Sequence, residues 1–150
     1  MNAVDKLASV DYDRDFYEWL CHQQDLLRQR RFEEIEDLGS ELLHAVQSWT
    51  TQILVHLTCL TFALSSEPKR HWVNEIRTFR SSLHTRLESS PSLRSKLAQS
   101  YDKLWRRARK DACAKLRADG VLSLPEHCPF TLEQVLDEDY FACDPLGGPA

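Results

Sequence analysis

The sequence predicts an all-α fold, an up-and-down bundle of four main helices followed by a short C-terminal helix. Three observations support this prediction. Apolar residues recur at steps of three and four along four stretches, no stretch alternates apolar and polar residues between hairpin turns, and only 4 glycines occur in 150 residues. Short links favour antiparallel neighbours, and we expect one domain over residues 11–141 with flexible termini at 1–10 and 142–150.

The first helix is expected over residues 11–31. Its apolar side chains fall on one side at about 100° per residue, and Gln23 interrupts the centre of that side. A buried glutamine needs a hydrogen-bond partner. The apolar residues that define the side are Tyr12, Phe16, Trp19, Leu20, Leu26 and Leu27.

The second helix, over residues 35–64, has the clearest pattern. Gly39 lies on its apolar side, where it indicates either a close helix contact or a break. The most apolar part, residues 53–64, is shorter than the roughly 20 residues that span a bilayer, so we expect a buried helix and no membrane segment. The apolar positions are Ile35, Leu38, Leu42, Val46, Trp49, Ile53, Leu57, Leu60 and Leu64.

The remaining helices follow from start and stop signals as well as spacing. The third is expected to end near Ser89, and Ser90 with Pro91 starts the fourth, because serine accepts from free N–H groups and proline suits the first turn. Gly120 is placed to end the fourth helix. Thr131 and Gln134 form a capping box that opens a short helix through Leu136, with Asp139 as its outer limit. The inner faces carry Trp72, Ile76, Phe79, Leu83 and Leu87, then Leu93, Leu97, Tyr101, Leu104, Ala108 and Ala112.

Several phrases in this order resemble a bacterial family, the domain of unknown function 29. They are YDRDFYEW (12–19), LLR (26–28), RF (31–32), IEDLG (35–39), SPSL (90–93) and CPFTLEQVLDED (128–139). The resemblance covers about residues 11–141 and implies an all-helical domain in a bacterial cytoplasm. It implies no reaction, cofactor or catalytic residue.

Two features depart from the family pattern. The chain lacks about two helical turns between Phe32 and Gly39, and it has Cys59 and Leu60 where members often show a lysine and a tryptophan.

No catalytic, cofactor-binding or metal-binding residue is assigned from the sequence. The cysteines and histidines show no zinc-type spacing, since His56 and Cys59 are the one pair at helical spacing and supply only two ligands. Glu41 with His44 matches a di-metal motif once, without a second copy. There is no nucleophile elbow and no glycine-rich phosphate loop. The sequence therefore does not favour an enzyme, although a site assembled across helices stays open.

Gln23 and His56 fall on or beside the apolar faces of the first two helices. We hypothesise that they form a buried polar pair that ties these helices together. The alternative is that each is satisfied separately by backbone or water.

Charge is unevenly distributed along the chain. The net charge is −6 over residues 1–66, +9 over 67–118 and −7 over 119–150. The fourth helix carries a basic face about 30 Å long, at 1.5 Å per residue, opposite its apolar side. This basic face consists of Lys96, Lys103, Arg106, Arg107, Lys110 and Arg117.

The basic face supports the leading function hypothesis, a non-enzymatic helical domain that binds a protein partner or itself. The alternatives are a nucleic-acid-associated protein that binds phosphates through the same face, and an enzyme assembled across helices. A solvated face, or one paired with the acidic ends of the chain, is the plain explanation. Five widely spaced cysteines and the lack of an export signal favour the cytoplasm.

Overall fold

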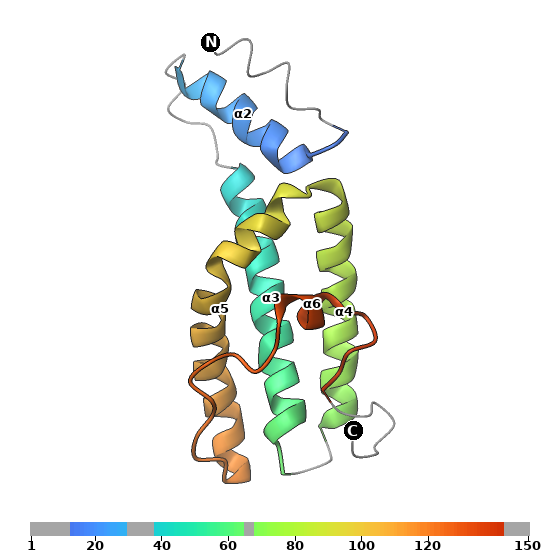
Figure 1. Ribbon diagram of the computed structural model, residues 1–150, viewed down its shortest axis with the longest axis vertical. Helices are drawn as coiled ribbons and strands as arrows, with labels where there is room; N and C mark the ends of the chain where they lie inside the picture. The colour runs from blue at the N-terminus through green and yellow to red at the C-terminus, as the bar shows by residue number, and fades with distance from the viewer. Residues whose placement is uncertain (1–12, 30–37, 65–67, 143–150) are drawn as a thin grey trace.

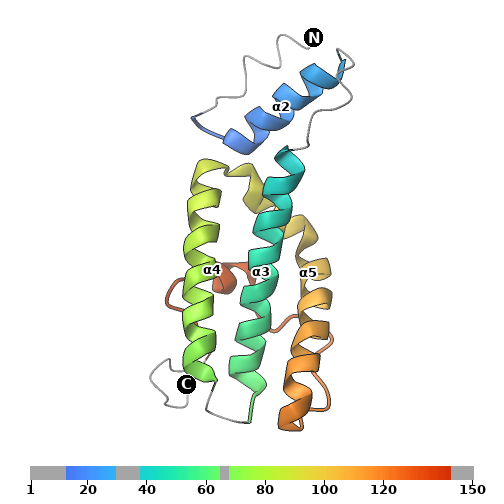
Figure 2. The ribbon, with the colours of Figure 1, turned by 180° about the vertical axis from the view of Figure 1, so that it is seen from behind.

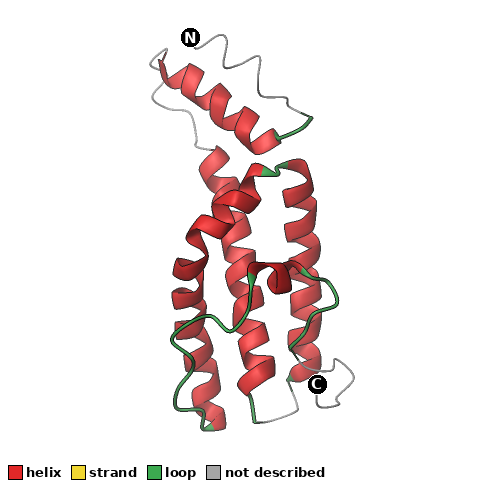
Figure 3. Cartoon of the chain, in the orientation of Figure 1, coloured by secondary structure: helices red, strands yellow, loops and turns green. Residues whose placement is uncertain are grey.

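The computed structural model describes residues 13–29, 38–64 and 68–142. The elements are α2 (Phe16–Gln29), α3 (Leu38–Phe62), α4 (Lys69–Ser89), α5 (Ser92–Leu116), the 3-10 turn η1 (Arg117–Asp119) and α6 (Leu132–Leu136). No strand occurs among these residues (Figure 3). The predicted all-α bundle of four main helices and a short C-terminal helix is confirmed. The predicted termini, the Phe32–Gly39 link and Ile35 lie outside the described residues, apart from Leu38, Gly39 and Ala142.

The three long helices run side by side, with α3 between α4 and α5 in both views (Figures 1 and 2). Helix α2 crosses the end of the bundle where α3 begins and where α4 passes into α5. It is 14 residues long against 25 for α3, or about 21 Å against about 37 Å at 1.5 Å per residue. Helix α6 lies across the middle of the bundle, against α3.

Helix α3 is the centre of the core. All residues from Ile53 to Leu60 are buried, because α4 covers one side of the helix and α5 the other. A helix that is apolar all round is typical of such a position. Its buried threonines are satisfied within the helix, since Thr50 and Thr58 donate to the carbonyls four residues earlier, at 2.7 Å each. The expected buried helix is confirmed, but it ends at Phe62 and leaves Leu64 79% exposed.

Gly39 marks a close helix contact rather than a break. It lies in the first turn of α3, and a Cβ atom there would stand 2.9 Å from Cys21 Sγ and 3.3 Å from Gln24 Oε1. Only a residue without a side chain lets α2 approach this closely.

The rotation of α2 differs from the prediction. The residues buried against the bundle are Tyr17 and Gln24, 7% and 6% exposed, whereas Trp19 and Leu20 are half-buried and Leu27 is 37% exposed. Tyr17 and Gln24 are the residues that face Gly39, so the close helix contact that the glycine permits decides which side of α2 is buried. The apolar spacing therefore predicted the helix correctly but misplaced its buried side by about one residue, or 100°.

The starts of α2 and α5 cap each other. Asp15 accepts from the backbone N–H of Glu18 in its own helix at 3.0 Å, and also from the N–H and the hydroxyl of Ser92 at the start of α5. In return, Ser90 Oγ accepts from the N–H of Tyr17 at 2.9 Å. The sequence correctly placed a helix start after Ser90, but it was wrong to expect this hydroxyl to cap its own helix, because it accepts instead from an N–H at the start of α2.

The C-terminal segment returns over the bundle. Gly120, with φ of 80°, ends η1 in the left-handed conformation as predicted. The predicted capping box is present, since Thr131 Oγ1 accepts from the N–H of Gln134 and Gln134 Oε1 accepts from the N–H of Thr131. Helix α6 ends at Leu136, short of the outer limit at Asp139.

Two side chains of α4 hold the free carbonyls at the end of α6. Arg80, 1% exposed, donates to the Val135 carbonyl at 2.8 Å and to the Gln134 carbonyl at 3.1 Å. His84 Nε2 lies 2.6 Å from the Leu136 carbonyl. A cation at a helix C-terminus is favourable because the unpaired carbonyls carry partial negative charge.

Candidate functional site

The six basic-face residues on α5 and η1 lie where the sequence placed them. All six are exposed, and they follow the helix for about 30 Å at 1.5 Å per residue. Lys96, Lys103 and Lys110 repeat every seven residues on the side away from the buried Leu97 and Leu104. The members are Lys96, Lys103, Arg106, Arg107, Lys110 and Arg117.

The acidic C-terminal segment lies against α4 and not against the basic face. Asp137, Glu138 and Asp139 raise the pKa of Arg80, although burial outweighs them and lowers it to about 10. Within the described part of the chain, no ion pair joins a carboxylate to Lys96, Lys103, Arg107 or Lys110. For these four residues the expected alternative of internal pairing is not seen.

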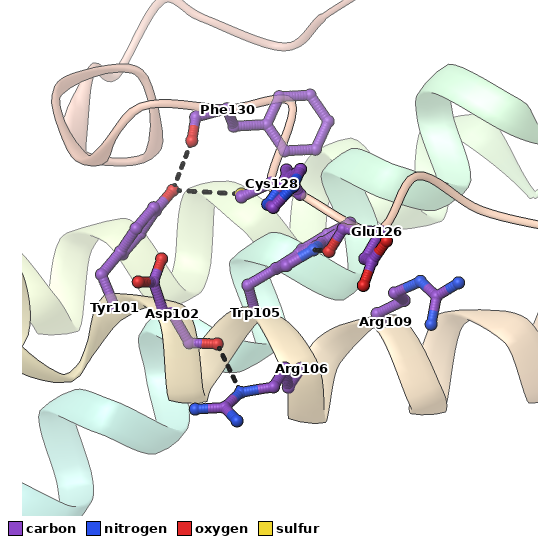
Figure 4. A pocket seen from close by; sticks show the side chains of 9 residues that line it. Tyr101, Asp102, Trp105, Arg106, Arg109, Glu126, Cys128 and Phe130 are labelled. Atoms are coloured by element: carbon purple, nitrogen blue, oxygen red, sulfur yellow. Dashed lines mark hydrogen bonds between the residues drawn. The ribbon is translucent and has the colours of Figure 1, made fainter.

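A groove runs between α5 and the segment that follows η1 (Figure 4). Its volume is about 630 Å³. One side is formed by α5 and the other by residues 126–130. The walls and rim that matter for its chemistry are Tyr101, Trp105, Arg106 and Arg109 of α5, with Cys128 and Phe130 opposite.

Hydrogen bonds from α5 hold the opposite wall of the groove in place. Tyr101 donates its hydroxyl proton to the Phe130 carbonyl at 2.8 Å, and Trp105 Nε1 donates to the Glu126 carbonyl at 2.9 Å. Arg109 donates to the Leu124 carbonyl at 3.0 Å. These bonds compensate the burial of the polar atoms and make the groove a preformed feature.

The thiol in the groove is protonated. The Cys128 thiol lies 3.6 Å from the Tyr101 hydroxyl, to which it donates, and burial raises the pKa of Cys128. Burial also raises the pKa of Tyr101. Since the thiolate is the nucleophilic form, this geometry does not activate Cys128.

The hypothesised pair of Gln23 and His56 is not formed. His56 is 5% exposed, but Gln24 and not Gln23 is the buried glutamine of α2. Helix α2 contacts α3 at Gly39, 17 positions before His56, which is about 25 Å along the helix at 1.5 Å per residue. The sequence pattern could not show this separation, because it does not say at which level two helices cross.

His56 is instead buried near the other end of the bundle. Its ring stacks on Phe79 with centroids 6.1 Å apart, and its Nδ1 has no hydrogen-bond partner. Burial, with smaller contributions from Lys115 and His71, lowers the pKa of His56 to about 4. One turn further along α3, burial raises the pKa of Cys59 to about 11. The imidazole is therefore neutral and the thiol protonated near pH 7.

The groove was not predicted from the sequence. Its opposite wall comes from the phrase CPFTLEQVLDED, which was used only to find a helix start and the family resemblance. Cys128 and Phe130 lie 27 and 29 residues from the Tyr101 hydroxyl that they contact. No short-range pattern places them together.

The described residues thus define a class of protein: an all-helical bundle with an exposed cationic helix face and a preformed groove beside it. Among residues 13–29, 38–64 and 68–142, no three His, Cys, Asp or Glu side chains are grouped to hold a metal ion. No helix in this part of the chain has the length and apolar character that crossing a membrane requires. The chain belongs to the family described as domain of unknown function DUF29, which it matches over residues 12–141. No curated protein and no solved structure matches it.

Family membership confirms the resemblance seen in the sequence. Cys59 and Leu60, where a difference from the family pattern was expected, lie in the core on α3, 0% and 2% exposed.

Proposed function

We propose that this protein is a non-enzymatic interaction domain of the bacterial cytoplasm, and that it binds an acidic protein partner through the basic face on α5. The observation that carries the proposal is the row of exposed cations without described carboxylate partners at Lys96, Lys103, Arg107 and Lys110. Like charges held along one rigid helix create a positive potential that steers an acidic surface into contact.

The positive face is maintained by the fold. Helix α5 is anchored by Leu97, Leu104 and Ala108, which are buried against α3, so its opposite side stays turned outward. The acidic segment at residues 137–139 is held near α4 through Arg80. Both arrangements support a face that is available to another molecule.

Binding to a synthetic polyanion tests the proposal directly. Fluorescently labelled poly-glutamate is titrated with the protein at about 50 and about 200 mM salt. We expect saturable binding that weakens as salt rises, because screening acts on exposed charges. In Lys103→Glu/Lys110→Glu the affinity should fall at least tenfold. The matched control is Arg70→Glu/Arg94→Glu, which makes the same charge change at exposed positions outside the basic face and should lose much less affinity.

Equal losses in the two double variants would show that net charge alone is responsible and would refute the proposed face. The absence of binding at the lower salt concentration would refute the proposal as a whole. Loss of a homodimer in Lys103→Glu/Lys110→Glu, measured by sedimentation, would identify a second copy of the chain as the acidic partner.

Nucleic acid is the second candidate for the same face. The basic face favours it, but Trp105, the neighbour of Arg106 in the sequence, is only 2% exposed and offers no face on which a base can stack. Titration of a DNA duplex in parallel distinguishes an acidic protein partner from nucleic acid. If the duplex binds more tightly than poly-glutamate, and its binding constant falls steeply as the salt concentration rises, the basic face is reassigned to nucleic acid.

The enzyme alternative gains no support from the groove. Its thiol has a raised pKa, and its tyrosine hydroxyl is already bonded to the Phe130 carbonyl. We therefore propose binding as the activity of this chain.

A further inference from the structure

The groove described above adjoins the basic face through one shared residue. Arg106 lines the groove, and it lies three residues after Lys103 and four before Lys110 on the same helix. Residues with these spacings are neighbours on a helix surface, with Cβ atoms about 5–6 Å apart. A partner that lies along the basic face therefore passes the mouth of the groove.

The interior of the groove offers uncharged surface from the ring of Tyr101 and from Cys128, both half-buried. Trp105 and Phe130, 2% and 5% exposed, lie beneath this surface and contribute little of it. The Tyr101 hydroxyl already donates to the Phe130 carbonyl and Trp105 Nε1 to the Glu126 carbonyl, so neither has a donor left for a ligand, and the Tyr101 ring presents carbon surface to whatever enters. The volume of about 630 Å³ is in the range of about 300–1,000 Å³ that is usual for ligand pockets.

The charges at the rim decide which kind of group enters. Asp102 and Glu126 line the groove and oppose an anion, whereas Arg106 lies on the side of the basic face. Arg109 is held by the Leu124 carbonyl. Carboxylates of a partner are therefore attracted to the basic face outside, and an uncharged side chain is the group that the groove accepts.

Building on the proposed function, we infer that the groove between α5 and residues 126–130 seats a large apolar or aromatic side chain of the acidic partner. The recognised segment is then an uncharged anchor flanked by carboxylates. A buried anchor surrounded by exposed charge is the usual arrangement of a binding hot spot, in which the anchor supplies affinity and the charges supply rate and register.

Two synthetic peptides test this inference. Both consist of glutamates with one central residue, tryptophan in the first and alanine in the second, so that their net charges are equal. We expect the tryptophan peptide to bind about tenfold more tightly in fluorescence anisotropy, which is the effect of a modest hot-spot side chain. The groove-filling variant Cys128→Phe should remove this difference while leaving the affinity for the alanine peptide unchanged.

The two proposals fail in different ways. If both peptides bind equally well to the wild-type protein, the groove inference is refuted and the basic face stands. If neither peptide binds, the proposed function is refuted. If Lys103→Glu/Lys110→Glu weakens the binding of both peptides and Cys128→Phe weakens only that of the tryptophan peptide, both proposals are supported.

A measurement on the wild-type protein covers the case in which Cys128→Phe does not fold. Alkylation of the Cys128 thiol by N-ethylmaleimide is followed by mass spectrometry of its tryptic peptide. The tryptophan peptide at saturation should slow the modification of Cys128 at least fivefold relative to the alanine peptide, with no such difference at Cys113, which lies outside the groove. Equal rates at Cys128 with the two peptides would overturn the inference.

Discussion

Removing the Asp15 carboxylate should destabilise two helix starts at once. Asp15 Oδ1 lies 3.0 Å from the N–H nitrogen of Glu18 and 2.8 Å from Ser92 Oγ, and its second oxygen accepts from the N–H of Ser92. The side chain therefore caps α2 and joins it to α5. No other described side chain bonds to the N–H of Ser92.

The cost of Asp15→Ala can be worked from these bonds. Loss of an N-cap costs about 1 kcal/mol. A hydrogen bond to a charged group contributes about 1.5–3 kcal/mol, and Ser92 is half-buried, so the lower part of that range applies. We expect the free energy of unfolding to fall by about 2–3 kcal/mol. Asp15→Asn keeps one acceptor oxygen and should cost about half as much.

Urea unfolding with linear extrapolation measures these changes. The matched control is Asp111→Ala, which removes an exposed carboxylate from α5 and should change the stability by less than about 0.5 kcal/mol. A double-mutant cycle of Asp15→Ala with Ser92→Ala isolates the bond between the two side chains, and we expect a coupling of at least about 0.5 kcal/mol. Additive effects, or a loss no larger than in the control, would refute the capping of one helix by the other.

Three further predictions concern the contact between α2 and α3, the core and the C-terminal segment. Gly39→Leu should lower the free energy of unfolding, measured in urea, by about 1–3 kcal/mol, because the new side chain overpacks against α2. The smaller change Gly39→Ala should cost less in a Cys21→Ala background, which removes the sulfur 2.9 Å from the new Cβ atom. An equal cost of Gly39→Ala with and without Cys21 would contradict this contact. Burial lowers the pKa of His56 to about 4 in the folded protein, from about 6.5 in the unfolded chain. As the pH falls, the unfolded chain therefore binds the proton first. The contribution of His56 to stability is complete above about pH 6.5 and is lost as the pH falls towards 4. His56→Phe should remove about 2–3 kcal/mol of that decline in urea midpoints compared between pH 7 and pH 4, and a profile parallel to that of the wild type would refute it. Arg80→Met should lower the free energy of unfolding by about 2–3 kcal/mol and speed proteolysis of the α6 segment, because two carbonyls lose a charged donor. The control Arg77→Met removes an exposed cation that lies over the Phe141 ring and should cost less than about 1 kcal/mol. Similar costs in the two variants would contradict the role of Arg80.

The basic face was predictable from the sequence because it depends on one helix alone. Once α5 is a helix with Leu97 and Leu104 inside, Lys103 and Lys110 must lie outside. The groove beside it was not predictable, because its two walls come from residues 101–109 and 126–130, and no local pattern determines how the connecting segment returns over α5.

The sequence by itself determined which stretches are helical and which residues mark several of their ends. Spacing of apolar residues, Gly120 as a left-handed cap and the box of Thr131 with Gln134 all act within a turn or two of the chain, so they can be read without the fold. The choice that Gly39 left open, between a contact and a break, could be settled only by the helix that packs on it.

Only the tertiary structure decided how the helices face one another. The rotation of α2 depends on the helix that packs against it. The N–H that Ser90 accepts from and the carbonyls that Arg80 holds lie between 54 and 73 residues away along the chain. Such contacts form when whole elements dock, and a helical pattern fixes the direction of a side chain around its own axis but not the neighbour that it meets. For the same reason the sequence could pair Gln23 with His56 on the apolar faces of neighbouring helices, whereas the fold places them at opposite ends of the bundle.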